Sequence, residues 1–120
     1  MRLRWLLIAL ALSVMLLGIH LYALAHFWYW HYRWLDTPMH ILAGMMMGAA
    51  IVGVLLRFRP RVYVLAIILG ALGWELFEYV FGISTGQPDY VWDTIHDILN
   101  DFLGAIILYV LARYTVWRSR

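Results

Sequence analysis

Four long apolar runs follow one another along the chain, separated by short polar or aromatic stretches. The runs cover residues 5–28, 38–56, 62–81 and 93–112. Each is about 19 to 24 residues long, and a helix needs about 20 to cross the hydrocarbon core of a bilayer. None shows the alternation of polar and apolar residues that is typical of a half-buried strand. Because only helices and closed barrels pair every backbone group in hydrocarbon, the pattern predicts four transmembrane helices.

The connections between the runs are short, which predicts how the helices are arranged. They cover residues 29–37, 57–61 and 82–92. Short connections make sequential helices antiparallel neighbours. We therefore expect an all-α fold: a polytopic membrane protein in which residues 1–120 form one domain, an antiparallel four-helix transmembrane bundle.

Residues that favour helix starts precede or open the second and fourth runs. Asp36 and Thr37 stand before Pro38, and proline is favoured at the first helical position. Asp93 opens the fourth run with an acid, which suits the N-terminal end of a helix. We therefore expect Asp36 or Thr37 and Asp93 to cap helices, a role that competes with a part in a binding site.

The composition supports a membrane protein. Hydrophobic residues make up 65% of the chain and the mean hydropathy is +0.78, whereas soluble domains are about 45–50% apolar. The chain has no cysteine, which excludes disulfides and thiolate metal sites. Its basic residues are not interleaved with aromatic residues in a polar setting, so a nucleic-acid partner is not expected.

The arginines predict the orientation of the bundle. All nine basic residues are arginines, and only Arg33 falls on the side of a four-span topology that faces away from both termini. The other eight are Arg2, Arg4, Arg57, Arg59, Arg61, Arg113, Arg118 and Arg120. By the positive-inside rule, we expect both termini to be cytoplasmic in a bacterial inner membrane. The aromatic residues within 28–34 would then form a belt at the outer interface.

A competing interpretation concerns the first run. Residues 1–25 have the basic start, the apolar middle and the A-x-A end of a secretory signal peptide. The run is long for such a segment, and its removal would leave an odd number of spans. A retained first helix is the favoured prediction, and the sequence leaves processing open.

Acids and histidines gather at one depth of the predicted bundle. All seven acids lie at or near the end that faces away from both termini. At 1.5 Å per residue, Glu78 lies about 5 Å and Glu75 about 9 Å below the end of the third helix. Asp97 lies about 6 Å and Asp101 about 10–12 Å below the start of the fourth. His40 falls in the first turn of the second helix, so three helices supply polar groups to one layer.

Helical spacing predicts that these side chains point into the bundle. Asp93, Asp97, Asn100 and Gly104 follow the i, i+4, i+7, i+11 spacing of one helix stripe. His40 lies one turn before Gly44, and small residues at this spacing let membrane helices approach closely. We therefore expect these polar groups on packing faces and not against lipid.

The cost of burying charge points to a bound cation. A charged side chain near mid-bilayer costs roughly 2.5–3.5 kcal/mol on insertion scales. Carboxylates held close together need either protons or a countercharge, and Arg33 is the only basic residue expected on this side. A divalent metal supplies the charge, and oxygen ligands with one or two imidazoles suit Mg, Mn, Fe or Zn.

The candidate residues divide by expected role. The expected metal ligands are His40, Glu75, Glu78, His96, Asp97 and Asp101. The candidate catalytic residues are Glu75, Glu78 and Asp97, because a metal-bound water could act as a nucleophile beside them. Asp36, Asp93 and Asn100 are expected to orient the ligands or to cap helices. No organic cofactor is predicted, and the oligomeric state is left open.

Three ordered motifs resemble a known pattern. "LDTPMHILAGMMMGA", "GWELFEY" and "WDTIHDILNDFLGAIIL" resemble small bacterial membrane proteins of the VanZ-like and YjdF types. In those families an acid and a histidine open one helix, a glutamate-bearing helix follows, and a helix with spaced acids or amides and a glycine closes the site. The matching positions are Asp36, His40, Glu75, Glu78, Asp93, Asp97, Asn100 and Gly104. The resemblance covers residues 34–110 and implies a polytopic inner-membrane protein without an assigned reaction.

Two functions compete on these observations. The first is an outward-facing acid and histidine site that holds a divalent metal and acts on a lipid head group by hydrolysis or group transfer. The second is a non-enzymatic structural or interaction protein whose polar layer only fixes helix packing. Proton-coupled transport is disfavoured, because an ion path needs acids at several depths. The motifs of serine hydrolases, zinc proteases and phosphate-binding loops are absent.

Overall fold

A computed structural model describes residues 1–57, 59–83 and 86–118 of the chain. The described part contains helices and no strands. The long helices are α1 (Leu3–Ala25), α3 (Asp36–Val54), α4 (Pro60–Val80) and α5 (Tyr90–Thr115), and α1 is joined to α3 by the single turn α2 (Trp28–His31) and the 3-10 turn η1 (Arg33–Leu35). All four long helices are long and apolar enough to cross a membrane. This confirms the predicted all-α fold with four transmembrane helices.

The boundaries of the first helix differ from the prediction. The predicted run reaches residue 28, but α1 ends at Ala25. Phe27 has a φ of 56°, in the left-handed region that residues other than glycine rarely adopt. This residue stops the helix and turns the chain, so that Trp28–His31 form a separate turn beside the end of α1.

The predicted helix caps are wrong. Asp36 is itself helical, with φ −59° and ψ −41°, because η1 runs directly into α3 and leaves no extended residue for a cap. The aromatic residues before the fourth run extend α5 to Tyr90, so Asp93 lies inside its first turn. Neither helix start has a side-chain cap hydrogen bond. Both acids still lie where the helix dipole favours negative charge.

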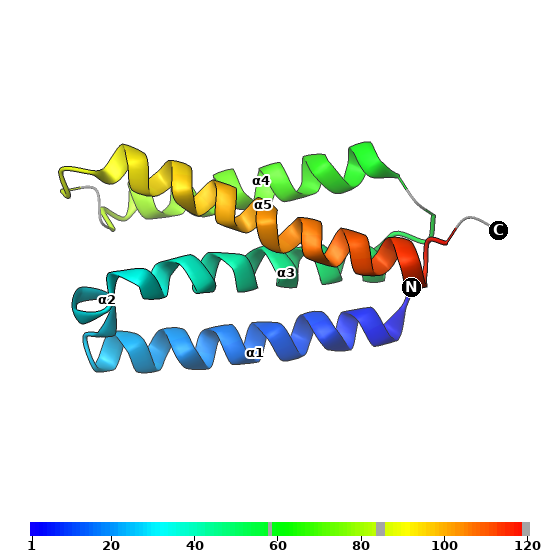
Figure 1. Cartoon of the computed structure of the whole chain (residues 1–120), viewed down its shortest axis with the longest axis horizontal. Coiled ribbons are helices and arrows are strands. Elements are labelled where there is room, and N and C mark those ends of the chain that lie inside the picture. The colour runs from blue at the N-terminus through cyan, green and yellow to red at the C-terminus, as the bar shows by residue number, and fades with distance from the viewer. Residues whose placement is uncertain (58, 84–85, 119–120) are drawn as a thin grey trace.

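Helix α3 is the centre of the bundle. It packs against α1 on one side and α5 on the other, and α4 lies against α3 and α5 (Figure 1). The start of α1 and the end of α5 lie at one end of the bundle, which we call the terminal end (Figure 1). The turn α2, the end of α4 and the start of α5 lie at the opposite end, which we call the α2 end. Arg120, which contributes to the predicted orientation, lies outside the described residues, and the orientation itself stays a prediction.

Two glycines set the close contact between α3 and α5. A Cβ added to Gly44 would overlap the backbone of Asp101, and one added to Gly104 would overlap the carbonyl oxygen of Ile41. The two backbones therefore touch directly, as small residues allow in membrane helix pairs. This contact fixes the rotation of both helices near the α2 end, and with it the direction of their polar side chains.

The terminal half of the bundle is packed by apolar and aromatic side chains. One buried cluster there consists of Val52, Tyr63, Ile67, Ala105, Ala112 and Trp117. The hydroxyl of Tyr63 donates a hydrogen bond to the carbonyl oxygen of Ala105 at 2.5 Å. All the buried histidine and acidic side chains of the described residues lie in the other half of the bundle: His40, Glu75, Asp97 and Asp101.

Candidate metal centre

The structure brings together side chains from three helices near the α2 end, as the sequence predicts. Helix α3 supplies Asp36 and His40, α4 supplies Glu75 and Glu78, and α5 supplies Asp97 and Asp101. His40 and Glu75 are each 7% exposed, Asp97 is 5% exposed and Asp101 is 2% exposed. Such burial of acids in an apolar bundle is rare unless they pair with one another or bind an ion.

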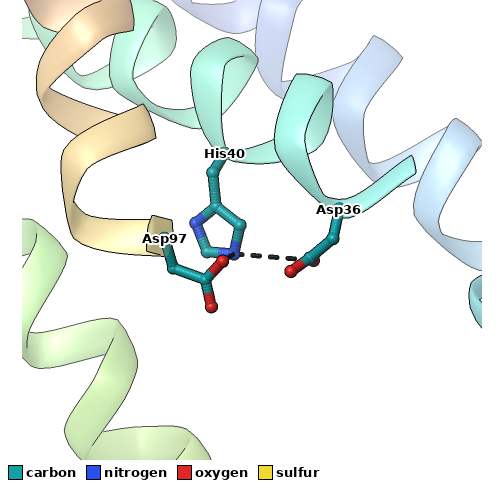
Figure 2. Close-up of side chains that lie close together, drawn as sticks. All are labelled: Asp36, His40 and Asp97. Atoms are coloured by element: carbon teal, nitrogen blue, oxygen red, sulfur yellow. Dashed lines mark ion pairs between the residues drawn. The ribbon is translucent and has the colours of Figure 1, made fainter. Parts of the chain in front are cut away.

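His40 lies among three carboxylates. Its Nε2 is 3.4 Å from Oδ1 of Asp97 and 3.7 Å from Oδ1 of Asp36, and Figure 2 shows both acids at this edge of the ring. Its Nδ1 is 3.2 Å from Oδ1 of Asp101. Because a carboxylate only accepts hydrogen bonds, Nδ1 donates to Asp101. Nε2 is then the nitrogen available to a cation, an arrangement common among metal-binding histidines.

One group of candidate ligand atoms is centred on this ring. Ligand atoms of Asp36, His40 and Asp97 all lie within 4.8 Å of one another. Metal–ligand distances of about 2.0–2.6 Å place two ligands of one ion up to roughly 5 Å apart. The spacing therefore fits a single cation held by two carboxylates and one imidazole.

A second group contains only carboxylates. Oxygens of Glu75, Glu78 and Asp97 also lie within 4.8 Å of one another. Neither carboxylate oxygen of Glu75 has a hydrogen-bond partner among the described residues. Thr94 faces Glu75 from α5, but its buried hydroxyl also lacks a partner at hydrogen-bond distance. A buried carboxylate without a partner is costly, so Glu75 requires a proton or a cation.

The structure does not bring His96 to either group. The sequence predicts His96 as a ligand, but its side chain is exposed on α5. Adjacent residues on a helix point about 100° apart, so the buried position of Asp97 turns His96 away from the bundle. Asn100 and Asp93 are partly buried and belong to neither group. Asp101 is placed to orient His40 through Nδ1 and is not part of either group.

A cavity of about 960 Å³ opens beside these groups. Most of its lining comes from α1, α3 and α4, with further residues from α2, η1, α5 and the segment between α4 and α5. Near the α2 end its lining is polar and includes Asp36, His40, Glu78, Asp93 and Asp101. Farther along, its lining is apolar and includes Leu16, Leu17, Ala43, Met46, Met47 and Trp74.

Tyr29 and His20 also line this cavity, and sequence reasoning gave neither a role in the site. The hydroxyl of Tyr29 lies 2.8 Å from Nδ1 of His20. Burial, followed by the nearby charges of Asp36 and Glu78, raises the pKa of Tyr29 to about 12. The phenol therefore keeps its proton at neutral pH. When Nδ1 of His20 carries hydrogen and donates to the phenolic oxygen, the one O–H of Tyr29 can donate at the polar end of the cavity.

An ion pair lies over the same end of the cavity. Nη2 of Arg33 is 3.1 Å from Oδ2 of Asp89, and both side chains are largely exposed. This pair joins η1 to the segment between α4 and α5. Arg33, the basic residue expected on this side of the membrane, is therefore paired with Asp89 and not with the buried acids.

Comparison with known proteins supports the membrane assignment. A family model described as "Predicted membrane protein (DUF2238)" matches residues 2–118. The chain belongs to the DUF2238 family. The match covers all four spanning helices, so this DUF2238 protein is a multi-pass membrane protein. Comparisons with curated proteins and with solved structures give no match. The VanZ-like and YjdF-type resemblance stays a prediction, as does the bacterial inner membrane.

The site of this DUF2238 protein is suited to hard or borderline divalent cations. Carboxylate oxygens suit Mg and Mn, and the added imidazole suits Mn, Fe or Zn. The acids do not all lie in one solvent-exposed patch, because Glu75, Asp97 and Asp101 are buried between helices. The cavity lining includes three residues of the two candidate ligand groups, Asp36, His40 and Glu78, and also Asp101, which contacts His40. A ligand in the cavity would therefore contact the candidate metal ligands directly.

Proposed function

We propose that this protein is a divalent-metal-dependent membrane enzyme that acts on the head group of a lipid near the α2 end. The proposal depends on one observation: three residues that line the cavity, Asp36, His40 and Glu78, also supply candidate metal-ligand atoms. A substrate that fills the cavity would place its polar end against these residues.

The shape and lining of the cavity favour a lipid. Its volume of about 960 Å³ is at the upper end of the roughly 300–1,000 Å³ typical of small-molecule sites. The apolar lining follows the spanning helices α1, α3 and α4, so one hydrocarbon chain could lie along it while the head group reaches the polar end. A phospholipid or a polyprenyl-phosphate-linked lipid has this division between chain and head group.

The residues at the polar end can divide the work of hydrolysis or group transfer. A cation bound there would polarise a phosphoryl or carbonyl oxygen and provide a nucleophilic water. Glu78 is partly buried at the cavity and can accept a proton from that water. Tyr29 keeps its phenolic proton and can donate it in a hydrogen bond to the head group when Nδ1 of His20 donates to the phenolic oxygen.

The competing function is a packing role without catalysis. The contacts of His40 with Asp97 and Asp101 join α3 to α5 with no cation required. Interhelical polar contacts of this kind stabilise membrane bundles. This alternative does not account for Glu75, whose two oxygens are buried without a partner among the described residues.

Metal analysis separates the two functions. Wild-type protein, Glu75→Gln and Asp97→Asn would be purified in detergent and assayed for bound metal, with helicity measured by circular dichroism. Asp89→Asn is the matched control, because Asp89 is an acid at the same end that belongs to neither ligand group. Stoichiometric metal in wild type and control, lost in both site variants with helicity retained, supports the metal site. Metal-free wild type, with site variants that only unfold more easily, supports the packing role.

A second experiment tests the lipid. Phospholipids with Mg²⁺, Mn²⁺ or Zn²⁺ would be incubated with the protein in mixed micelles and the released head group followed by mass spectrometry. Ala43→Phe narrows the apolar part of the cavity, whereas Leu69→Phe, on a side chain 72% exposed, is the control. We expect product that disappears with a chelator and in Glu78→Gln, and that falls in Ala43→Phe alone. Equal turnover in Ala43→Phe and Leu69→Phe would rule out the cavity as the chain-binding site.

A further inference from the structure

We propose that the site holds two divalent cations and that Asp97 bridges them. One cation would be bound by Asp36 and His40, and the other by Glu75 and Glu78. This inference deepens the proposed function and rests on its metal site, but it does not depend on the identity of the substrate.

Asp97 is the residue that the two groups share. Each group of three has ligand atoms within 4.8 Å of one another, and Asp97 belongs to both. Each group is therefore compact enough for its own ion. A carboxylate has two oxygens, and ions about 3.5–4 Å apart are commonly held in two-metal sites that act on phosphate esters. Asp97 comes from α5, while the other ligands come from α3 and α4 on either side.

Each group also has a feature, besides its clustered acids, that fits a bound cation. In the set of Glu75, Glu78 and Asp97, Glu75 is 7% exposed, and both of its oxygens lack a hydrogen-bond partner among the described residues. In the histidine group, Asp101 accepts the hydrogen bond of Nδ1, so that Nε2 points to Asp36 and Asp97. The unpartnered oxygens of Glu75 indicate a cation at Glu75, Glu78 and Asp97. The direction of Nε2 leaves a nitrogen ligand facing two carboxylates, which fits a second cation at Asp36, His40 and Asp97.

The charge of the cluster favours two ions over one. The two groups contain the carboxylates of Asp36, Glu75, Glu78 and Asp97. If these four were ionised, one divalent cation would leave two negative charges on them, whereas two cations would balance all four; Asp101, outside both groups, accepts the hydrogen bond of His40. Arg33 does not supply the missing charge, because it pairs with Asp89. Unpaired charge in a membrane interior raises the free energy of the folded protein. A second ion would lower this cost by pairing the remaining carboxylates.

The two positions differ in chemistry, which makes them separable. The Asp36–His40 side offers nitrogen and oxygen and would favour Mn²⁺, Fe²⁺ or Zn²⁺. The Glu75–Glu78 side offers oxygen only and would favour Mg²⁺ or Mn²⁺. Mn²⁺ suits both positions and is paramagnetic, so it is the probe for the experiment.

The test counts Mn²⁺ and measures its magnetic coupling. Protein loaded with Mn²⁺ and desalted would be assayed for metal per chain, and its electron paramagnetic resonance spectrum recorded. We expect two ions per chain and an exchange-coupled spectrum in wild type and in Asp89→Asn. Asp36→Asn and Glu78→Gln, each at a partly buried residue, should each keep one ion with an uncoupled spectrum. Asp97→Asn should lose the coupling and most of both ions.

The outcomes are distinguishable. One uncoupled ion in wild type overturns the bridge but leaves a metal-dependent function standing. No bound ion overturns both the bridge and the metal site. If Asp97→Asn fails to fold, Asp36→Asn and Glu78→Gln still decide, because loss of both ions in either one contradicts two separable positions. Circular dichroism of every variant confirms that the helices are intact.

Discussion

His40 and Asp101 face each other across the contact between α3 and α5, with Nδ1 of the ring 3.2 Å from Oδ1 of the acid. The glycine contact beside them brings the two backbones together, since Gly44 meets the backbone of Asp101 itself. The hydrogen bond fixes the rotation of the imidazole and leaves Nε2 toward Asp36 and Asp97. The packing of two helices therefore determines which ring nitrogen is available to a cation.

This relationship predicts that Asp101 orients the site without binding the ion. Asp101→Asn should weaken Mn²⁺ binding about 10- to 100-fold, the effect typical of removing a carboxylate that supports a metal-binding histidine. Titration calorimetry measures the change. Asn100→Ala is the informative comparison, because the sequence pattern assigns the orienting role to Asn100, which belongs to neither group. Unchanged binding in Asp101→Asn, or an equal loss in Asn100→Ala, would contradict the role of Asp101.

The glycine contact gives a prediction about stability. Gly44→Ala and Gly104→Ala each place a methyl group into the backbone of the facing helix. We expect each to lower the free energy of unfolding by about 1–3 kcal/mol, the usual cost of overpacking. Gly73→Ala is the control, because a Cβ at Gly73 meets no atom within 4 Å. That variant should gain up to about 1 kcal/mol from helix propensity. Unfolding by denaturant in mixed micelles would show lower stability in Gly44→Ala and Gly104→Ala and higher stability in Gly73→Ala. The same change in stability in all three variants would contradict the close contact between α3 and α5.

The sequence predicts the four helices and the depth of the site because both follow from length and direction. Apolar runs long enough to cross a bilayer determine the spans, and antiparallel neighbours bring His40, Glu75 and Asp97 to one level. Rotation about the helix axis is less well determined. The sequence pattern favours a stripe through Asp93, Asp97, Asn100 and Gly104. The buried stripe of α5 shares Asp97 and Gly104 with it but runs through Asp101 in place of Asn100. Contact between backbones sets this rotation, and no local pattern reports it.

The pairing of His20 with Tyr29 could not be predicted for a different reason. It depends on the left-handed conformation of Phe27, which turns the chain so that Tyr29 reaches back to α1. Phenylalanine gives no signal for such a conformation, since glycine and asparagine are the residues that usually adopt it. The continuous apolar run instead predicts a helix through residue 28.

Arg2 gives a prediction at the terminal end. Its guanidinium donates hydrogen bonds to the carbonyl oxygens of Leu55 at 2.6 Å and Leu56 at 2.8 Å, just beyond the end of α3. The free carbonyl groups at a helix end need such partners. Arg2→Gln should lower the free energy of unfolding by about 1.5–3 kcal/mol, the range for hydrogen bonds to a charged group. Arg4→Gln, which removes the same charge from an exposed side chain, should have little effect. Equal thermal shifts in the two variants would mean that only charge matters.

Tyr29 is a reporter of charge at the site. Its pKa is raised from 10.0 to about 12, first by burial and then by Asp36 and Glu78. Because the folded value is the higher one, the folded protein holds this proton more tightly than the unfolded chain. The resulting stability is complete below pH 10 and is lost as the pH rises toward 12. Tyr29→Phe should therefore flatten the dependence of unfolding on pH in this window.

The same residue tests the metal site without an activity assay. The ultraviolet absorbance of tyrosinate, compared between wild type and Tyr29→Phe, isolates the titration of this one phenol. Mn²⁺ bound beside Asp36 and Glu78 would offset their negative charge, so loading the protein should lower the pKa of Tyr29 from about 12. Burial remains the larger cause, so the pKa should stay above 10. If Mn²⁺ binds in stoichiometric amounts and the titration does not move, the ion lies away from Asp36 and Glu78, and the positions proposed for both cations are wrong.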